Sequence, residues 1–180
     1  MERTVARVAL FAALIAALGL IPQITLPFAG GVPITAQTLG IMLAGLILGP
    51  WRGALAVLVF LTVIALGAPL LAGGRGGLGV FAGPTVGFLV GFPIATFAVG
   101  QLYRLTQDAG PMLAGLLASV LGGIVVLYIF GVIGLAIVAD MTLFNALLAV
   151  LIFIPGDILK AVVAAFINRE VRRARPDLAD

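Results

Sequence analysis

Long stretches without a charged side chain constrain this sequence more than any other feature. No Asp, Glu, Lys or Arg occurs between Arg7 and Arg52, or between Asp108 and Asp140. Hydrophobic residues make up 63% of the 180 residues and charged residues only 9%, whereas a soluble domain has about a quarter charged residues. The mean hydropathy is +1.30. Because several apolar runs could cross a bilayer as helices, the sequence predicts an all-α, polytopic membrane protein surrounded by lipid.

The composition also restricts the chemistry that the chain could perform. It contains no cysteine and no histidine, which excludes disulfides, thiol nucleophiles, histidine bases and the usual zinc ligands. The seven carboxylates form no pair or cluster typical of hydrolases or metal sites, and no Gly-Lys-Ser/Thr phosphate loop occurs. We therefore expect neither an enzyme nor a bound metal or cofactor. The net charge of +3 indicates membrane orientation and not nucleic-acid binding.

The chain is expected to form a single transmembrane domain, residues 1–180. Its first apolar run is similar to a signal-peptide core, but retention as a span is favoured because the rest of the chain is also apolar. Proline and glycine mark the points at which a helix cannot continue. The six expected spans are approximately 5–21, 35–48, 52–66, 84–104, 111–138 and 155–172.

The segments that connect these spans differ in character. Irregular loops are expected at 22–34 and 67–83, and a partial or interfacial helix is expected at about 141–153, which is too short to cross the bilayer. Alternatively, this helix continues into the sixth span with a kink at Pro155-Gly156. The fifth span is longer than a bilayer requires, so it should tilt, protrude or break near Gly131 or Gly134.

Basic residues predict the orientation of the chain in the membrane. Six spans place both termini on one side, which would hold nearly all the arginines, whereas the other side would hold only Arg75. Cytoplasmic sides carry an excess of Lys and Arg, so both termini are predicted to be cytoplasmic. Trp51 and Tyr103 are expected to be interface anchors. The arginines on the predicted cytoplasmic side are Arg3, Arg7, Arg52, Arg104, Arg169, Arg172, Arg173 and Arg175.

One acid and one base lie within an apolar stretch near the end of the chain. Asp157 and Lys160 are three residues apart, so they share a face of a helix that Pro155 could begin. Ionisable groups inside a membrane are costly and usually mark a substrate or ion site. The pair, with the positive end of the helix, suits a small ligand that has an anionic group, N–H donors or both. The alternative is a structural ion pair.

Two other segments could supply polar groups. Gln37, beside Thr35 and Thr38, begins the second span, where its amide could bind a ligand or join two helices. Residues 74–79 match G-x-G-x-x-G, but the strand and acid of a dinucleotide site are missing. These glycines could instead form a moving lid, on which Arg75 either binds a carboxylate or is solvated. Tyr128 and Asn145 are weaker candidates for binding and are expected to be packing and interface residues.

Small residues repeat every four positions in four of the expected spans, so each string follows one helix face and permits close helix contact. Packing within the chain is the simplest interpretation. The strings are Ala9-Ala13-Ala17, Ala36-Gly40-Ala44, Gly83-Gly87-Gly91 and Gly115-Ser119-Gly123.

Four short elements follow one another in a distinctive order and spacing. They are Pro33-Ile34-Thr35-Ala36-Gln37-Thr38, Gly73-Gly74-Arg75-Gly76-Gly77-Leu78-Gly79, Gly83-Pro84-Thr85 and Ile154-Pro155-Gly156-Asp157-Ile158-Leu159-Lys160-Ala161. Together they strongly resemble the BioY family, the biotin-specific substrate-binding components (S-components) of energy-coupling-factor (ECF) transporters. The resemblance covers nearly the whole chain. It implies a six-helix S-component in the cell membrane of a bacterium or archaeon, with an outward-facing site that binds biotin with high affinity.

The resemblance also implies partners and site residues. The implied partners are a transmembrane coupling subunit and two ATPase subunits, with Ala9, Ala13 and Ala17 contacting the coupling subunit. Many relatives carry a tyrosine where this chain has Phe88, so one hydroxyl is absent here. The implied substrate-binding residues are Gln37, Arg75, Gly76, Gly77, Thr85, Phe88, Asp157 and Lys160.

The chemistry of biotin suits these residues, because its ureido ring donates N–H groups and its valeryl chain ends in a carboxylate. Asp157 suits the ureido N–H groups, and Lys160 or Arg75 suits an oxygen at either end, so the direction of the ligand stays open. One alternative function is a stand-alone secondary carrier for a small carboxylated vitamin, coupled to protons through Asp157. Another is a membrane scaffold in which the charged pair is structural.

Overall fold

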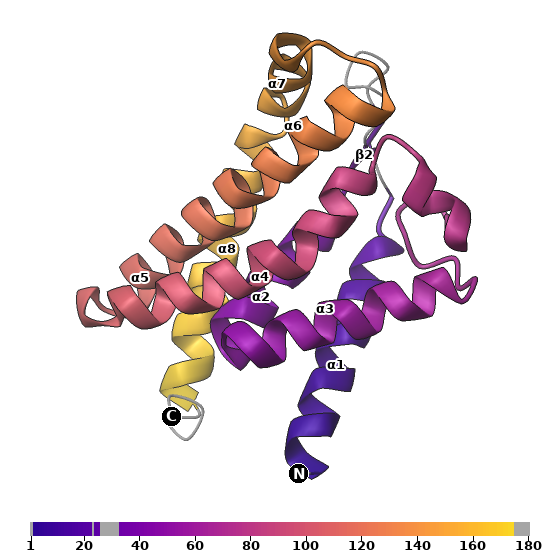
Figure 1. Ribbon diagram of the computed structural model, residues 1–180. Helices are drawn as coiled ribbons and strands as arrows, with labels where there is room; N and C mark the ends of the chain where they lie inside the picture. The colour runs from indigo at the N-terminus through magenta and orange to yellow at the C-terminus, as the bar shows by residue number, and fades with distance from the viewer. Residues whose placement is uncertain (1, 23, 26–32, 175–180) are drawn as a thin grey trace.

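The computed structural model describes residues 2–22, 24–25 and 33–174, and it consists almost entirely of helices (Figure 1). One short antiparallel pair joins β1 (Ile24–Thr25) to β2 (Pro33–Ile34). The helical elements are α1 (Glu2–Gly19), α2 (Gln37–Leu48), α3 (Pro50–Ala65), η1 (Leu78–Ala82), α4 (Val86–Thr106), η2 (Gln107–Ala109), α5 (Pro111–Ala118), η3 (Ser119–Val126), α6 (Leu127–Val138), α7 (Leu143–Leu151) and α8 (Ile154–Ala174).

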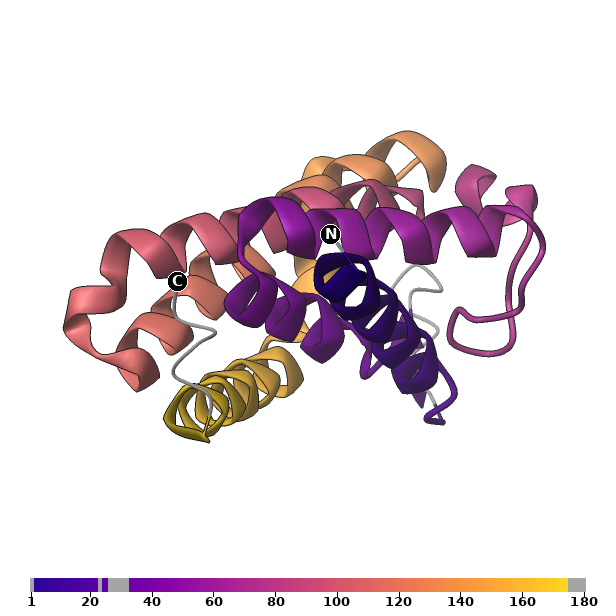
Figure 2. The same cartoon turned by 90° about the horizontal axis from the view of Figure 1, so that it is seen from below.

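Helix α4 lies at the centre of the fold and contacts α2, α3, α5, η3 and α6. Helix α1 begins and α8 ends at the same end of the molecule, whereas β2 and α7 lie at the opposite end (Figure 1). Seen from below, α1 and α8 point toward the viewer and α3 lies across the view (Figure 2). Because α2 packs against both α1 and α8, the starts of α2 and α8 come close together.

Small residues allow these helices to approach one another closely. A Cβ atom at Gly134 in α6 would come within 2.5 Å of the Cα atom of Gly87 in α4. A Cβ atom at Gly40 in α2 would lie 2.9 Å from the Ile15 side chain in α1, and one at Gly123 in η3 would lie 2.7 Å from a side chain of α2. The small residues of the expected second, fourth and fifth spans therefore pack within the chain, as predicted.

The outer surface carries large apolar side chains in the pattern expected of a helix that faces lipid. On α5, η3 and α6 the exposed residues recur every four positions, at Leu113, Leu117, Leu121, Val125, Ile129, Ile133 and Ile137. Among the described helices, the segments Val86–Ala109 and Pro111–Val138 are long and apolar enough to cross a membrane, and the bent pair α7 and α8 together would make a third. The six-span topology and the cytoplasmic termini therefore stay predictions.

The segment from Pro111 to Val138 is helical throughout, so it does not break near Gly131 or Gly134, one of the outcomes expected from its length. Its irregular part lies earlier, in the π-helical turns of η3. The two glycines serve packing instead, because a Cβ atom at Gly131 would overlap the ring of Phe88 and one at Gly134 would meet α4.

Both loops that were expected to be irregular contain short regular elements. Of loop 22–34, residues 23 and 26–32 lie outside the described residues, and the paired strands β1 and β2 lie within it. Loop 67–83 contains the short helix η1 and a tight turn in which Leu71 pairs with Arg75. Gly73 and Gly74 in this turn have φ values of 78° and 69°, which favour glycine. The turn fixes the position of Arg75.

A sharp bend separates α7 from α8. The two helices meet at an angle of 53°, and the break comes at Ile152 and Phe153, just before Pro155. A proline at the start of α8 is tolerated because its missing N–H would have no intrahelical acceptor. A short helix is therefore present where one was expected, but the bend comes at Ile152 and Phe153 and not at Pro155-Gly156. The bend places the first turn of α8 in the interior.

Candidate functional site

A pocket lies between the starts of α2, α4 and α8 and the turn that carries Arg75. The space between its walls, counted out to the solvent at its open mouth, is about 590 Å³. The pocket, called the Asp157 pocket below, is lined by Thr35, Gln37, Thr38, Leu71, Ala72, Arg75, Thr85, Phe88, Leu89, Phe92, Leu127, Tyr128, Phe153, Asp157 and Lys160.

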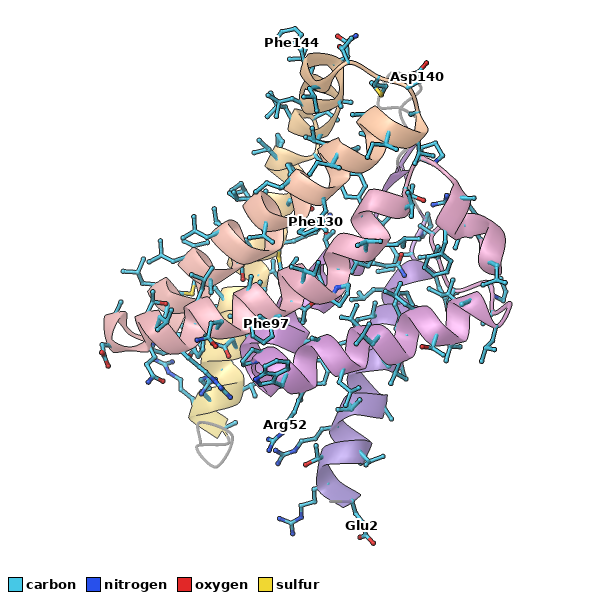
Figure 3. All side chains as sticks on the ribbon, viewed as in Figure 1. Glu2, Arg52, Phe97, Phe130, Asp140 and Phe144 are labelled. Atoms are coloured by element: carbon cyan, nitrogen blue, oxygen red, sulfur yellow. The ribbon has the colours of Figure 1, made fainter. Side chains whose placement is uncertain are left out.

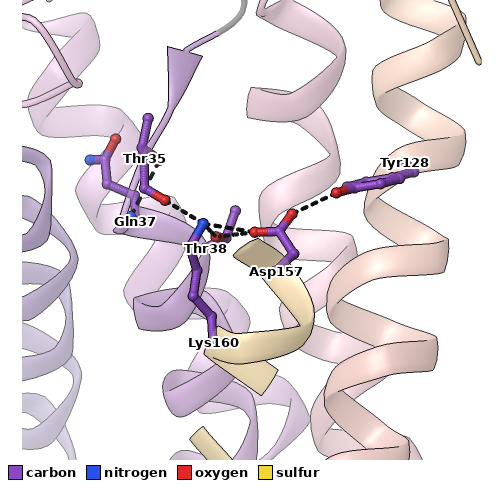
Figure 4. Close-up of polar contacts among 6 residues, drawn as sticks. All are labelled: Thr35, Gln37, Thr38, Tyr128, Asp157 and Lys160. Atoms are coloured by element: carbon purple, nitrogen blue, oxygen red, sulfur yellow. Dashed lines mark hydrogen bonds and ion pairs between the residues drawn. The ribbon is translucent and has the colours of Figure 1, made fainter. Parts of the chain in front are cut away.

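Asp157 is the centre of a hydrogen-bond network at one side of this pocket (Figure 4). Its carboxylate is 3% exposed as a residue and accepts from Lys160 Nζ at 2.7 Å, from Thr38 Oγ1 at 3.0 Å and from Tyr128 Oη at 2.7 Å. The acid and base therefore form an ion pair, as expected from their spacing. Three donors on one carboxylate offset much of the cost of burying its charge.

The ammonium group of Lys160 is fully used by the same network. Besides Asp157, it donates to the Thr35 carbonyl oxygen at 2.6 Å and to Thr38 Oγ1 at 3.0 Å (Figure 4). An ammonium group has three N–H donors, so these contacts occupy all of them. Lys160 thus joins α8 to the start of α2, and a ligand would have to displace a contact in order to bind it directly.

Arg75 lies at another side of the pocket and is only partly used. Among the described residues, its guanidinium makes one hydrogen bond, from Nε to the Ala72 carbonyl oxygen at 3.2 Å. This bond holds the side chain against its own turn and leaves the two terminal nitrogens available. A guanidinium with free terminal N–H groups is suited to bidentate binding of a carboxylate.

The wall between Arg75 and the Asp157 network is mainly apolar. Phe88, Phe92, Leu127 and Phe153 are all buried and line it. The hydroxyl of Thr85 is also buried there, and it has no hydrogen-bond partner among the described residues. A buried polar atom without a partner indicates that a ligand or water completes its bonding. The pocket therefore combines a few polar groups with a mainly apolar lining.

Gln37 joins segments of the chain, one of the two roles expected from its position, and its role in ligand binding stays a prediction. It lines the pocket, yet its side chain is almost completely buried and its Nε2 donates to the carbonyl oxygens of Ile15, at 3.4 Å, and Leu70, at 3.1 Å. The amide thereby joins α1 to the loop that leads to Arg75. Only its oxygen is left to face a ligand.

Two of the predicted substrate-binding residues do not line the pocket. Gly76 and Gly77 are half-buried in the loop, and the Gly77 N–H donates to the Ile64 carbonyl oxygen at the end of α3, at 2.8 Å. A Cβ atom at Gly76 would collide with the backbone of Ala68. Their described role is therefore to let the loop fold back on α3, which supports Arg75.

Sequence reasoning missed the part that Tyr128 plays. It was expected to have a packing role, but its hydroxyl donates to Asp157 from a helix more than twenty residues earlier in the chain. No local motif marks it, because the contact depends on how the continuous helix of α5, η3 and α6 crosses α8, which it contacts through α5 and η3. The other predicted residues, Gln37, Arg75, Thr85, Phe88, Asp157 and Lys160, all line the pocket.

The small residues of α1 differ from the other strings, because Ala9, Ala13 and Ala17 are all exposed. The buried face of α1 is formed by larger residues, among them Phe11 and Ile15. A strip of small exposed side chains leaves the backbone open to close approach by another helix.

Comparison with known proteins identifies the family. The BioY family model matches residues 2–177 of the chain. The chain belongs to the BioY family. The biotin transporter BioY of Rhodobacter capsulatus is 46% identical over 98% of this chain and 96% of its own length. The biotin transporter BioY of Rhizobium etli is 50% identical, over 93% of this chain and 92% of its own length.

A solved structure supports the fold of this BioY-family chain. The crystal structure of the S-component for biotin from an ECF-type ABC transporter is similar with a TM-score of 0.87 and 33% identity. The match covers 96% of this chain and 92% of that one. The predicted S-component-like helical fold is confirmed, and the chain is a membrane protein, in agreement with its apolar outer surface.

Proposed function

We propose that this chain is the biotin-binding S-component of an ECF-type transporter in the cell membrane of a bacterium or archaeon. It captures biotin from outside and delivers it across the membrane. The observation that carries this proposal is the Asp157 pocket, in which a saturated acid–base network and a partly free guanidinium are separated by an apolar wall. Family membership selects biotin among the small carboxylated molecules that such a pocket could hold.

The distribution of free donors supports one direction for the ligand. All three N–H groups of Lys160 are occupied within the network, whereas the terminal nitrogens of Arg75 have no partner among the described residues. The carboxylate of biotin therefore binds Arg75. The ureido ring lies at the Asp157 side, where the carboxylate has one lone-pair site left to accept an N–H group. The sulfur ring and valeryl chain contact the apolar residues of the pocket.

The exposed face of α1 is the proposed contact with a transmembrane coupling subunit, which two ATPase subunits accompany. Its support is the contrast between the exposed string Ala9, Ala13 and Ala17 and the buried small residues of other helices. Ala13→Leu should weaken assembly with purified coupling module while leaving biotin affinity unchanged. The control is Leu10→Ala, because Leu10 is exposed beside the string. Ala12→Leu would not serve as a control because Ala12 is buried.

A binding screen tests the proposed ligand. Purified protein should be stabilised by excess biotin, because a ligand that binds only the folded state raises its stability by several kcal/mol. Other water-soluble vitamins at the same concentration should have little effect. Equal stabilisation by unrelated vitamins, or none by biotin, would reject the assignment.

Transport measurements distinguish the proposed S-component from a stand-alone secondary carrier. In vesicles, the proposed function requires ATP and the partner subunits for efficient uptake of biotin. A carrier coupled through Asp157 would instead take up biotin without partners, driven by a pH gradient.

A further inference from the structure

A second pocket lies at the other end of the molecule, where α1 begins and α8 ends. It is formed by four arginines from four different helices, together with the turn between α2 and α3. We call it the arginine pocket. Its lining residues are Arg7, Gly45, Leu46, Ile47, Leu48, Gly49, Arg52, Gly100, Tyr103, Arg104, Gln107 and Arg172.

Among the residues that the structure describes, no acid balances the charges in this pocket. No carboxylate lines it among the described residues, and none of its four arginines forms a salt bridge there. The described salt bridges at this end belong to Arg169 and Arg173, both with Glu170. Four guanidinium groups around one cavity repel one another, so their arrangement is more favourable when an anion is bound between them.

One of the arginines, Arg172, is held in place by the protein. Arg172 donates from a terminal nitrogen to the Leu46 carbonyl oxygen at 3.1 Å, and its Cζ lies 4.5 Å from the centre of the Tyr103 ring. Tyr103 is buried, so its expected role as an interface anchor is wrong, and it supports Arg172 instead. Arg104 lies against the turn at Gly49, where a Cβ atom would be 3.0 Å from its terminal nitrogen.

The surroundings of the pocket favour a lipid as the source of the anion. Arg52 lies at this end of the molecule (Figure 3), and α3 continues from it with exposed apolar residues. Trp51 is 75% exposed, and Leu55 and Leu58 are each 49% exposed along the same helix. An anionic phospholipid could place its phosphate among the arginines while its acyl chains follow the apolar surface of α3.

The geometry points to a binding site for the phosphate group of an anionic phospholipid, formed by Arg7, Arg52, Arg104 and Arg172. Free phosphate has the same recognition chemistry but gains nothing from the apolar surface beside the pocket. The site is separate from the Asp157 pocket and does not depend on which vitamin that pocket binds. Phosphate binding by several guanidinium groups is charge-assisted and can be bidentate, so it should be strong in this position.

The test uses delipidated, full-length protein in uncharged detergent. Short-chain phosphatidylglycerol, phosphatidylcholine of the same chain length, and inorganic phosphate are titrated separately, with binding followed by calorimetry. The double variant Arg52→Gln/Arg104→Gln should weaken phosphatidylglycerol binding by roughly a hundredfold. The matched control Arg3→Gln/Arg173→Gln removes the same charge from exposed positions outside the pocket and should change it by less than about threefold. Thermal melting checks that both variants are folded.

Specific and saturable binding of phosphatidylglycerol, lost only in the pocket variant, would support the site. Equal binding of phosphatidylcholine, or equal loss in the control variant, would overturn it, because either result means general attraction to the surface. Equally tight binding of inorganic phosphate would assign the pocket to a soluble anion and overturn the lipid assignment. Loss of coupling-subunit binding in the pocket variant with lipid binding intact would assign it to an acidic protein surface.

Discussion

The two pockets of this molecule differ in how their charged side chains are paired. In the Asp157 pocket, an acid and a base are paired at 2.7 Å and nearly every polar atom of the network has a partner. In the arginine pocket, four guanidinium groups meet without a described acid. Burial explains the difference, because Asp157 is almost fully buried, whereas Arg52 and Arg104 are exposed and water can solvate them.

The difference in charge pairing indicates which kind of ligand each pocket is suited to bind. A neutral, pre-bonded network can accept and release an uncharged ring such as a ureido group without leaving a bare charge in an apolar cavity. An unbalanced cluster at the surface favours an anion at all times and releases it reluctantly. The first arrangement fits a transported ligand, and the second fits a component of the surroundings that stays in place.

The largest effect is expected from breaking the balance in the Asp157 pocket. Asp157→Ala leaves the Lys160 charge without its counter-ion, so stability should fall by about 3 kcal/mol and biotin affinity by at least about a hundredfold. Arg52→Gln, which removes an exposed charge from the other pocket, should change stability by less than about 0.5 kcal/mol. Thermal unfolding and calorimetric titration measure both quantities.

A second variant separates charge balance from ligand contact. Asp157→Ala/Lys160→Met removes both charges, so it should recover most of the stability that Asp157→Ala loses. Biotin affinity should not recover, because the acceptor for the ureido group is still absent. If the double variant is as unstable as the single one, the ion pair is not what stabilises this side of the pocket.

The next effect concerns the free guanidinium of the Asp157 pocket. Arg75→Ala should weaken biotin binding by roughly tenfold to a hundredfold, because it removes charge-assisted hydrogen bonds to the carboxylate. Biotinamide, which lacks that carboxylate, should bind the wild-type protein less tightly than biotin does. Its affinity for Arg75→Ala should equal its affinity for the wild-type protein. A loss of the same size for both ligands would place Arg75 away from the carboxylate and reverse the proposed direction.

A smaller effect on stability and biotin affinity is expected when the tyrosine of the Asp157 pocket is replaced, and none when the tyrosine of the arginine pocket is replaced. Tyr128→Phe removes the hydroxyl that donates to Asp157, so it should cost about 1 kcal/mol in stability and weaken biotin binding several-fold. Tyr103→Phe keeps the ring that supports Arg172 and removes a hydroxyl with no described hydrogen bond, so neither quantity should change measurably. Equal effects of the two variants would mean that the contact with Asp157 contributes nothing.

The sequence predicted best what depends on local spacing. Asp157 and Lys160 could be paired in advance because i and i+3 positions share a helix face and a proline marks the start of that helix. The tight turn around Arg75 and the close packing at Gly40 and Gly87 follow from glycine in the same way. Local chemistry therefore indicated Asp157, Lys160, Gln37 and Arg75, whereas Thr85 and Phe88 came from the resemblance to the BioY family.

Contacts between segments that are distant in the sequence could not be predicted from local spacing. Lys160 donates to the carbonyl oxygen of Thr35, 125 residues away, and any residue at that position offers the same carbonyl. Tyr128 contacts Asp157 because α5 and η3, which lead into α6, pack against α8. Tyr103 supports Arg172 because α4 holds it in the interior and not at the surface. Such partners depend on tertiary packing, which periodicity and composition do not specify.

The smallest effect distinguishes the two pockets by their response to salt. Raising NaCl from about 0.1 M to about 1 M shortens the screening length from about 10 Å to about 3 Å, which weakens attraction between exposed charges far more than between buried ones. Phosphatidylglycerol binding at the arginine pocket should therefore weaken several-fold more than biotin binding, which should change by less than about threefold. Parallel titrations of both ligands at each salt concentration provide the measurement. If biotin binding is the more sensitive of the two, the Asp157 pocket is open to water and its network is not the protected, balanced structure that its hydrogen bonds indicate.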